Sequence, residues 1–127
     1  MVYCLYHIAG GRFLESFDIA RKAVDAASDK QAANIVLLDV RNICSFTDYF
    51  VIETGDSERQ LRTIMEETRK VLKEAGIRPH HEEGEPDSGW LLLDYGDVVI
   101  HIFGREERDY YNLDELWKDG VPVIRMQ

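Results

Sequence analysis

The sequence predicts a single α/β domain whose helices pack mainly on one face of a β-sheet, and three observations support this class. Apolar residues recur at three- and four-residue steps in two segments, which is typical of amphipathic helices. Two short runs of apolar, aromatic and β-branched residues indicate buried strands. Two further runs are joined by a Gly-Asp pair, which predicts a β-hairpin. A length of 127 residues suits one domain with its own core.

The two predicted helices carry charged residues between their apolar positions. The apolar positions of the first run from Leu14 to Ala27, and Ser28-Asp29-Lys30 ends it. Those of the second run from Leu61 to Ala75. Ser57 precedes this helix and Gln60 stands three residues on, which is the pattern of a capping box.

The remaining segments are shorter. Residues 35–40 and 48–54 read as strands. The polar segment 77–88 predicts a loop with a short edge strand at 80–82. Short helical pieces are expected at 106–111 and 113–117.

These elements divide the chain into an N-terminal extension at 1–13, a domain at 14–117 and a C-terminal tail at 118–127. The extension lacks the features of a signal peptide, and no window approaches the roughly 20 apolar residues that span a membrane. Cys4 and Cys44 do not make a disulfide framework, which fits a reducing compartment. We therefore expect a cytoplasmic protein.

The predicted hairpin, Trp90 to Phe103, is the most informative segment. A two-residue turn at Gly96-Asp97 sets its register, and side chains alternate between the two faces of each strand. One face is then almost wholly apolar and should pack on the helices; it carries Leu91, Leu93, Tyr95, Val98, Ile100 and Ile102. The other face carries Trp90, Leu92, Asp94, Val99, His101 and Phe103.

This second face mixes large apolar groups with an acid and an imidazole, so we expect part of it to be exposed. An exposed patch that contains a tryptophan is a candidate interface, because aromatic residues dominate binding hot spots. The alternative is that the C-terminal helices cover it.

The net charge of −9 argues against direct binding to nucleic acid. Such binding needs a basic patch that neutralises phosphates, and the sequence contains no suitable run of Lys and Arg. No direct nucleic-acid site is therefore predicted. The acidity favours a basic protein partner, or serves solubility alone.

Catalytic and metal-binding alternatives rest on a few residues. Asp94 and Asp97, together with Gly55-Asp56-Ser57, could form the Mg²⁺ and triphosphate site of a nucleotidyltransferase. However, the two acids flank a turn, no lysine-rich cradle accompanies them, and Asp97 is more simply a turn residue. The cluster at 80–83, His-His-Glu-Glu, has no metal-ligand spacing and reads as a solvated loop. No metal or other cofactor is expected.

Three sequence blocks occur together with characteristic spacing. They are Asn-Ile-Val-Leu-Leu-Asp-Val at 34–40, Thr-Asp-Tyr-Phe-Val-Ile at 47–52 running into Gly-Asp-Ser-Glu-Arg-Gln at 55–60, and Gly-Trp-Leu-Leu-Leu-Asp-Tyr-Gly-Asp-Val-Val-Ile-His-Ile-Phe at 89–103, which Glu-Arg-x-Tyr-Tyr-x-Leu-x-x-Leu-Trp follows at 107–117. With these blocks, the chain from Leu14 to Trp117 resembles the ribosomal silencing factor family, also called Iojap-like. Residues 1–13 are additional, and Asp56 stands where the family often has Asn or Thr.

The resemblance implies a mixed α/β sheet that is related to nucleotidyltransferases but lacks their catalytic residues. It implies a protein that is not an enzyme. Such a protein binds the large ribosomal subunit through universal large-subunit protein fourteen, blocks joining of the small subunit and so represses translation. Family members are commonly homodimers when free. The alternatives are an assembly factor for the large subunit and a nucleotidyltransferase-like enzyme.

The resemblance also implies a contact site. The tryptophan of the third block corresponds to Trp90, in a region that contacts the ribosomal protein. We extend the predicted site to Leu92, Asp94, Tyr95 and His101. Tyr95 fits least well, because the hairpin register puts it on the core face.

Overall fold

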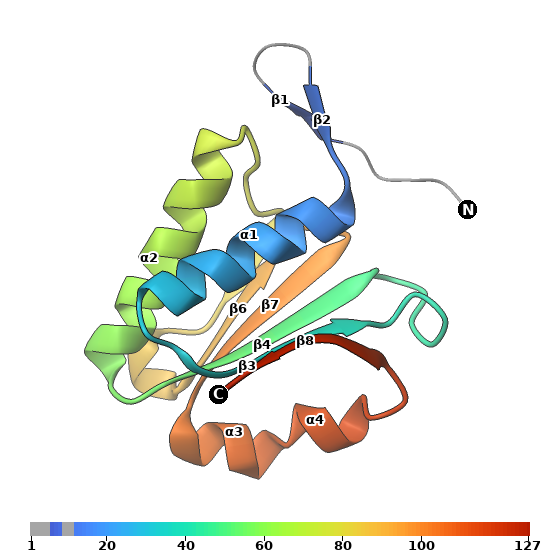
Figure 1. The fold of residues 1–127 in the computed structure, drawn as a ribbon. Helices are drawn as coiled ribbons and strands as arrows, with labels where there is room; N and C mark the ends of the chain where they lie inside the picture. The colour runs from blue at the N-terminus through green and yellow to red at the C-terminus, as the bar shows by residue number, and fades with distance from the viewer. Residues whose placement is uncertain (1–5, 9–11) are drawn as a thin grey trace.

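A computed structural model describes residues 6–8 and 12–127 of the chain (Figure 1). Its α-helices are α1 (Ser16–Asp29), α2 (Glu58–Glu74), α3 (Arg105–Tyr111) and α4 (Leu113–Leu116), and a 3₁₀ turn, η1, spans Pro86–Ser88. Its strands are β1 (Tyr6–Ile8), β2 (Arg12–Leu14), β3 (Ala33–Asp39), β4 (Tyr49–Gly55), β5 (His81–Glu83), β6 (Trp90–Asp94), β7 (Val98–Gly104) and β8 (Val121–Met126).

Six strands form one mixed sheet in the order β5-β6-β7-β4-β3-β8. Strands β4 and β7 are parallel, with Tyr49 opposite Val98 and Gly55 opposite Gly104, and the other neighbours are antiparallel. The predicted mixed α/β sheet is confirmed. The hairpin register is also confirmed, because β6 and β7 pair Trp90 with Phe103.

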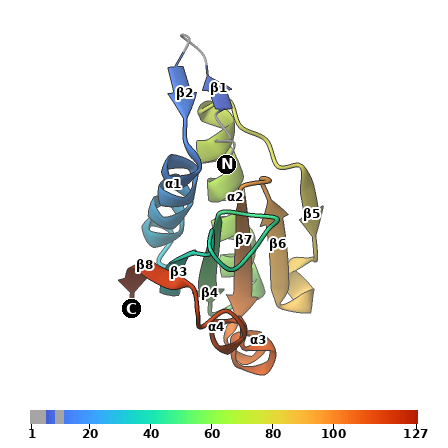
Figure 2. The same ribbon diagram turned by 90° about the vertical axis from the view of Figure 1, so that its right-hand side faces the viewer.

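The sheet has a helical layer on each face, and the two layers are unequal. The long helices α1 and α2 lie on one face, and the short helices α3 and α4 lie on the other (Figures 1 and 2). The α1–α2 side holds the main core, which includes the predicted apolar face of the hairpin. The α3–α4 side holds a smaller cluster around Val36, Phe50 and Phe103. Helices thus pack mainly on one face, as predicted. Within the described residues no helix is long and apolar enough to cross a membrane.

Helix α2 begins as predicted at Ser57, whose Oγ accepts from the backbone N–H of Gln60 at 3.1 Å. The reciprocal bond differs from a capping box, because Oε1 of Gln60 accepts from the backbone of Asp56 at 2.6 Å. Nε2 of Gln60 donates to the carbonyls of Lys30 and Gln31. This side chain therefore joins the start of α2 to the α1–β3 turn.

The two ends of the chain differ from the prediction. The segment expected to be a C-terminal tail contains β8, which pairs antiparallel with β3 and packs Ile124 against the main core. Gly120 and Pro122 resemble loop signals, yet proline is tolerated on an edge strand, where its missing N–H can face solvent. In the expected N-terminal extension, β1 pairs with β2, and residues 1–5 and 9–11 lie outside the described part. Helix α1 begins at Ser16, because Leu14 belongs to β2.

Candidate functional site

Trp90 and Leu92 lie on the face of β6 that the α3–α4 layer covers only in part. Both are half-buried, and they pack against the smaller core cluster. Their partners on β7, Phe103 and His101, are buried. The expectation of partial exposure therefore holds for β6, whereas the alternative, coverage by the C-terminal helices, holds for β7.

Aromatic rings hold the indole of Trp90 in place. The ring of Phe103, on β7, stacks on the indole with ring centroids 5.1 Å apart. The ring of Tyr111, on α3, has its centroid 4.4 Å from that of the indole. Such pairs contribute about 0.5–1.5 kcal/mol each beyond the area they bury. In addition, Nε1 of Trp90 donates to Nδ1 of His101 at 3.2 Å. The indole is thus fixed in orientation before any partner arrives.

His101 lies beneath Trp90 and is only 6% exposed. Burial lowers the pKa of its imidazole to about 4, so the ring is neutral at physiological pH. Because Nδ1 accepts the indole N–H, the single ring proton belongs on Nε2. Within the described part of the chain, Nε2 has no hydrogen-bond partner. His101 therefore supports Trp90 from below and contributes little surface of its own.

A small groove of about 260 Å³ opens beside Trp90, and we call it the Trp90 groove. Its lining is Glu83, Gly84, Ser88, Trp90, Leu92 and Tyr111. Gly84 has a positive φ of 90°, and a Cβ there would clash with the carbonyl oxygen of Trp90. The loop can therefore follow β6 closely only because residue 84 is glycine. The result is an apolar floor with one carboxylate at its edge.

The aromatic surface continues beyond this groove along the same face. Phe50 packs against His101 on one side and Trp117 on the other, and Phe46 extends the row at 66% exposure. Leu116 is also exposed. An apolar row of this kind, exposed at the surface, is a candidate contact surface.

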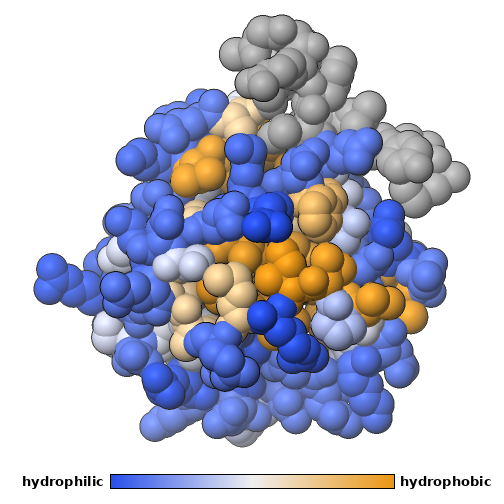
Figure 3. Space-filling model, in the orientation of Figure 1, coloured by the Kyte–Doolittle hydropathy of each residue, from blue (hydrophilic) through white to orange (hydrophobic). Residues whose placement is uncertain are grey.

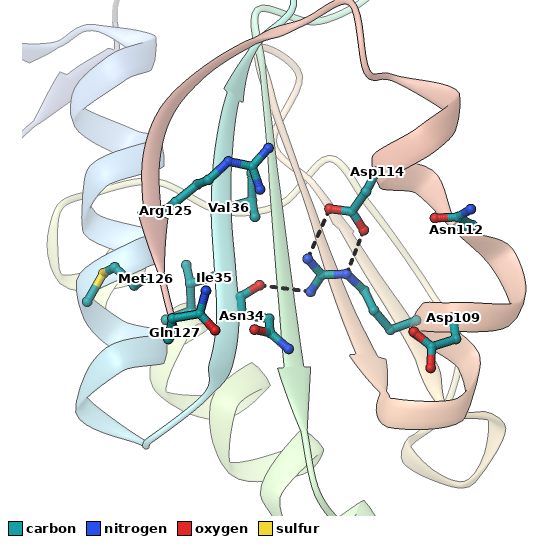
Figure 4. Close-up of a pocket in the computed structure, with 10 residues that line it drawn as sticks. Asn34, Ile35, Val36, Asp109, Asn112, Asp114, Arg125, Met126 and Gln127 are labelled. Atoms are coloured by element: carbon teal, nitrogen blue, oxygen red, sulfur yellow. Dashed lines mark hydrogen bonds and ion pairs between the residues drawn. The ribbon is translucent and has the colours of Figure 1, made fainter.

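Arg108 attaches the α3–α4 layer to the sheet. Its side chain is 10% exposed and binds both oxygens of Asp114, at 2.8 and 3.0 Å. Its Nη1 also donates to the carbonyl of Asn34 and the hydroxyl of Thr54, each at 2.8 Å. Figure 4 shows these contacts at Asn34 and Asp114, beside a polar pocket of about 230 Å³ that Arg125 also lines. One guanidinium therefore places α3, and with it Tyr111, over the hairpin.

Asp94 and Tyr95 take different positions from the other predicted site residues. Asp94 shares a face with Trp90 and Leu92, but its Oδ1 accepts from the backbone of Gly96 at 2.7 Å and stabilises the turn. Tyr95 is 0% exposed and belongs to the main core under α1 and α2. Its pKa is raised to about 12, chiefly by burial. Tyr95 cannot touch a partner from this position, because strand alternation directs it away from the Trp90 groove.

The parts of the nucleotidyltransferase alternative lie at opposite ends of the sheet. Asp97 precedes Val98, which pairs with Tyr49 at the start of β4, whereas Gly55 ends β4. The six steps from Tyr49 to Gly55 along β4 separate the two ends by roughly 20 Å. Burial raises the pKa of Asp97, and its backbone carbonyl accepts from the amides of Asp48 and Tyr49. These contacts are those of a turn residue.

Metal-site geometry is also missing at the histidine pair. His81 points toward Glu83, whose Oε1 is 3.4 Å from Nε2, while Glu82 bonds Arg69 on the other side of β5. Across residues 6–8 and 12–127, no group of three or more His, Cys, Asp or Glu side chains could hold a metal ion. Cys44 is a free thiol, and Cys4 lies outside the described residues.

The sequence-based site omitted Tyr111, Ser88, Gly84 and Glu83. The sequence could have indicated Tyr111, because a side chain four residues after Glu107 lies on the same side of a helix as Glu107. Glu107 fits against Gly89 and Gly104, where any Cβ would clash with its side chain. That contact turns this side of α3 toward the hairpin. Glu83 ends β5, Gly84 follows it and Ser88 ends η1, and no local pattern in the sequence specifies the path of this segment.

Comparison with known proteins gives a consistent result. Residues 14–127 match the family described as ribosomal silencing factor during starvation. A ribosomal silencing factor of Halalkalibacterium halodurans is 40% identical over 110 residues, covering 87% of this chain and 93% of that protein. The Bacillus subtilis factor is 42% identical over 102 residues, covering 80% and 86%.

A solved structure and a more distant relative extend this comparison. A crystal structure of a Chromobacterium violaceum protein superposes with a TM-score of 0.79 at 34% identity, covering 83% of this chain and 88% of that one. A mouse protein named for mitochondrial assembly of the ribosomal large subunit is 34% identical over 97 residues, covering 74% of this chain and 42% of its own length. Because the family model matches residues 14–127 and these silencing factors are 40% and 42% identical over most of their length, the chain belongs to the ribosomal silencing factor family.

Proposed function

We propose that this chain binds the large ribosomal subunit through universal large-subunit protein fourteen and blocks joining of the small subunit. The observation that carries the proposal is the Trp90 groove, a preorganised aromatic surface with an acidic edge. Binding at a subunit interface represses translation by occlusion alone. No catalytic residue or cofactor is needed, and we expect the chain to act in the bacterial cytoplasm.

The chemistry of the Trp90 groove suits a basic ribosomal protein. Trp and Tyr are the residues that most often dominate interfaces, and rigid rings lose little conformational entropy on binding. Glu83, at the end of β5, lines the groove, and the exposed Glu85 and Asp87 follow it in the segment that leads to β6. Together with a net charge of −9, these carboxylates favour approach of a cationic partner.

The predicted contact residues have distinct roles in this proposal. Trp90 and Leu92 touch the partner, together with Tyr111. Asp94 contributes charge near the turn. His101 positions the indole through its hydrogen bond, and Tyr95 stabilises the hairpin from the core side.

The direct test is binding of the purified protein to isolated large subunits. Trp90→Ala and Leu92→Ala should each weaken binding by about 2 kcal/mol, which is about thirtyfold in Kd. Ile43→Ala is the matched control, because Ile43 is an exposed aliphatic residue in the loop between β3 and β4, outside the groove. Circular dichroism verifies that each variant is folded. Unchanged affinity in both groove variants would contradict the site, and no binding by the wild type would contradict the function.

An assembly role for the large subunit is the second candidate, and the name of the mouse relative favours it. The two roles share a contact and differ in consequence. Removing a silencing factor leaves more joined ribosomes in nutrient-starved cells, whereas removing an assembly factor leaves immature large subunits in growing cells. Sucrose-gradient profiles under both conditions separate them.

The proposal also excludes a nucleotidyltransferase activity. The separation of Asp97 from the Gly55-Asp56-Ser57 loop along the sheet supports this exclusion. Titration with nucleoside triphosphates and Mg²⁺ should give no metal-dependent binding. Saturable, metal-dependent binding that Asp97→Asn abolishes would contradict this.

We further propose a homodimer in the free state, formed along β8. This strand is an open sheet edge that exposes Val121, Val123 and Met126. Figure 3 shows apolar surface between α1 and this end of the sheet. An open apolar edge readily pairs with a second chain. Val123→Asp should shift a dimer to monomer in analytical ultracentrifugation, and a monomeric wild type would contradict the proposal.

A further inference from the structure

A second groove lies on the other side of the β5–β6 edge, and we call it the basic groove. It is open, has a volume of about 570 Å³, and runs between the C-terminal end of α2, the following loop and β5. Figure 2 shows that loop passing from α2 to β5 at the edge of the sheet. The lining is Arg69, Lys73, Ile77, Arg78, Pro79, His80, His81 and Glu82.

The basic groove has an excess of positive charge in a protein that is strongly acidic overall. Its one carboxylate, Glu82, is bound by Arg69, with Nε at 2.8 Å from Oε2. Lys73 and Arg78 are exposed, and neither forms an ion pair with any residue that the structure describes. Two cations are therefore available to a ligand.

Capping of α2 does not account for these cations. The last turn of the helix is closed by backbone groups, because the N–H of Ile77 donates to Leu72 at 2.8 Å and that of Gly76 donates to Lys73 at 2.9 Å. Gly76 has the positive φ, 85°, that such a closure requires. Lys73 does interact favourably with the helix dipole. Arg78 lies beyond the helix and has no such structural role.

The position of the basic groove relates it to the Trp90 groove. Strand β5 is the edge of the sheet, and its consecutive residues face opposite sides. Glu82 lies on the basic side through its bond to Arg69, whereas Glu83 lines the Trp90 groove. A particle that holds this edge through the Trp90 groove can therefore also reach the basic groove, on the opposite face of the same two strands.

We infer that the basic groove contacts backbone phosphates of the ribosomal RNA in the large subunit. This inference rests on the proposed function, since the large subunit supplies the RNA. Arg78 offers a fork of donors that matches phosphate oxygens, and Lys73 offers a point charge. Imidazole N–H groups such as that of His80 add donors. The charge of the groove is opposite to that of the protein as a whole, as a phosphate contact requires.

The test is the salt dependence of binding to purified large subunits at constant Mg²⁺. A double variant, Lys73→Gln/Arg78→Gln, is compared with the wild type and with Lys30→Gln/Arg59→Gln. The control removes the same charge from exposed residues at the other end of the helical layer. Each phosphate contact contributes about 0.7–0.9 to the slope of log K against log salt. The groove variant should lose about one to two from that slope, and the control should lose none.

Raising KCl from about 50 to 200 mM should weaken the binding of both proteins, and the fold-loss of affinity should be roughly four to sixteen times smaller for the groove variant than for the wild type. Equal slopes in all three proteins, with the wild type bound, would overturn the inference and leave the proposed function intact. A wild type that does not bind would instead contradict the proposed function. A photo-crosslinking amino acid at position 78 identifies the neighbour. An adduct to RNA supports the inference, and an adduct to ribosomal protein alone overturns it.

Discussion

Glu53 provides the sharpest test of how this fold tolerates a buried acid. Its side chain is 0% exposed in the middle of β4, and neither carboxylate oxygen has a hydrogen-bond partner among the described residues. It shares a strand face with Val51, which belongs to the main core. Burial raises its pKa well above the ordinary value, and Arg108 only partly opposes this. We therefore expect a range of pH in which Glu53 is still protonated in the folded protein but ionised in the unfolded chain.

The sign of the pH dependence follows from proton binding. Between the unfolded pKa, about 4.3, and the raised folded pKa, the folded state holds the extra proton. The free energy of unfolding therefore falls as pH rises through this window, by about 1.4 kcal/mol per pH unit. In Glu53→Gln this contribution vanishes. The variant should gain about 1.4 kcal/mol over the wild type for each unit from about pH 5 upward, until the folded pKa is passed.

Urea unfolding of both proteins across this pH range, followed by tryptophan fluorescence, measures the difference. Other titrating groups are common to both proteins and cancel. Glu53→Leu should be at least as stable as Glu53→Gln, because an unpaired buried polar group costs about 1–3 kcal/mol. Parallel wild-type and Glu53→Gln curves, with a constant separation at every pH, would refute the protonated buried carboxyl.

Three further predictions concern the α3–α4 side of the sheet. Burial holds the pKa of His101 at about 4, so the stabilising contribution of the neutral imidazole is present above the unfolded pKa near 6.5 and is lost as pH falls through 4. The contribution amounts to about 3 kcal/mol. His101→Gln should remove this pH-dependent loss of stability from an acid-unfolding curve. Arg108→Lys should cost about 2–3 kcal/mol in thermal unfolding, since lysine cannot make the paired bonds to Asp114; equal melting temperatures would contradict this. Gly84→Ala should weaken large-subunit binding and lower stability by about 1–3 kcal/mol, because it strains a positive φ and displaces Trp90; unchanged values for both would show that the loop adapts.

Local signals predicted the hairpin closely and the ends poorly. The Gly96-Asp97 turn allows one register, and that register placed Tyr95 and Val98 on the core face where the structure has them. By contrast, Pro122 and Gly120 look like loop residues in isolation. Only the open edge of β3 makes their segment a strand, and an edge partner far away in sequence leaves no local pattern.

The candidate site divides in the same way. Trp90 and Leu92 followed from alternation along one strand. Tyr95 was included because it belongs to the same sequence block as Trp90. Its burial shows that a residue of that block can face the core instead of the contact surface. Tyr111 required knowledge of how α3 docks, which depends on the buried contacts of Arg108.

The sequence by itself determined the α/β class, the two long helices, the hairpin register and the family. These depend on helical and strand periodicity and on turn geometry, all of which act over a few residues. Only the tertiary structure decided which surfaces stay open. The Trp90 groove needs a ring from α3, and the basic groove gathers Arg69 and Arg78 from separate segments into one cluster. A net charge of −9 concealed that cluster, because charge counted along a chain does not record which side chains become neighbours when the core closes.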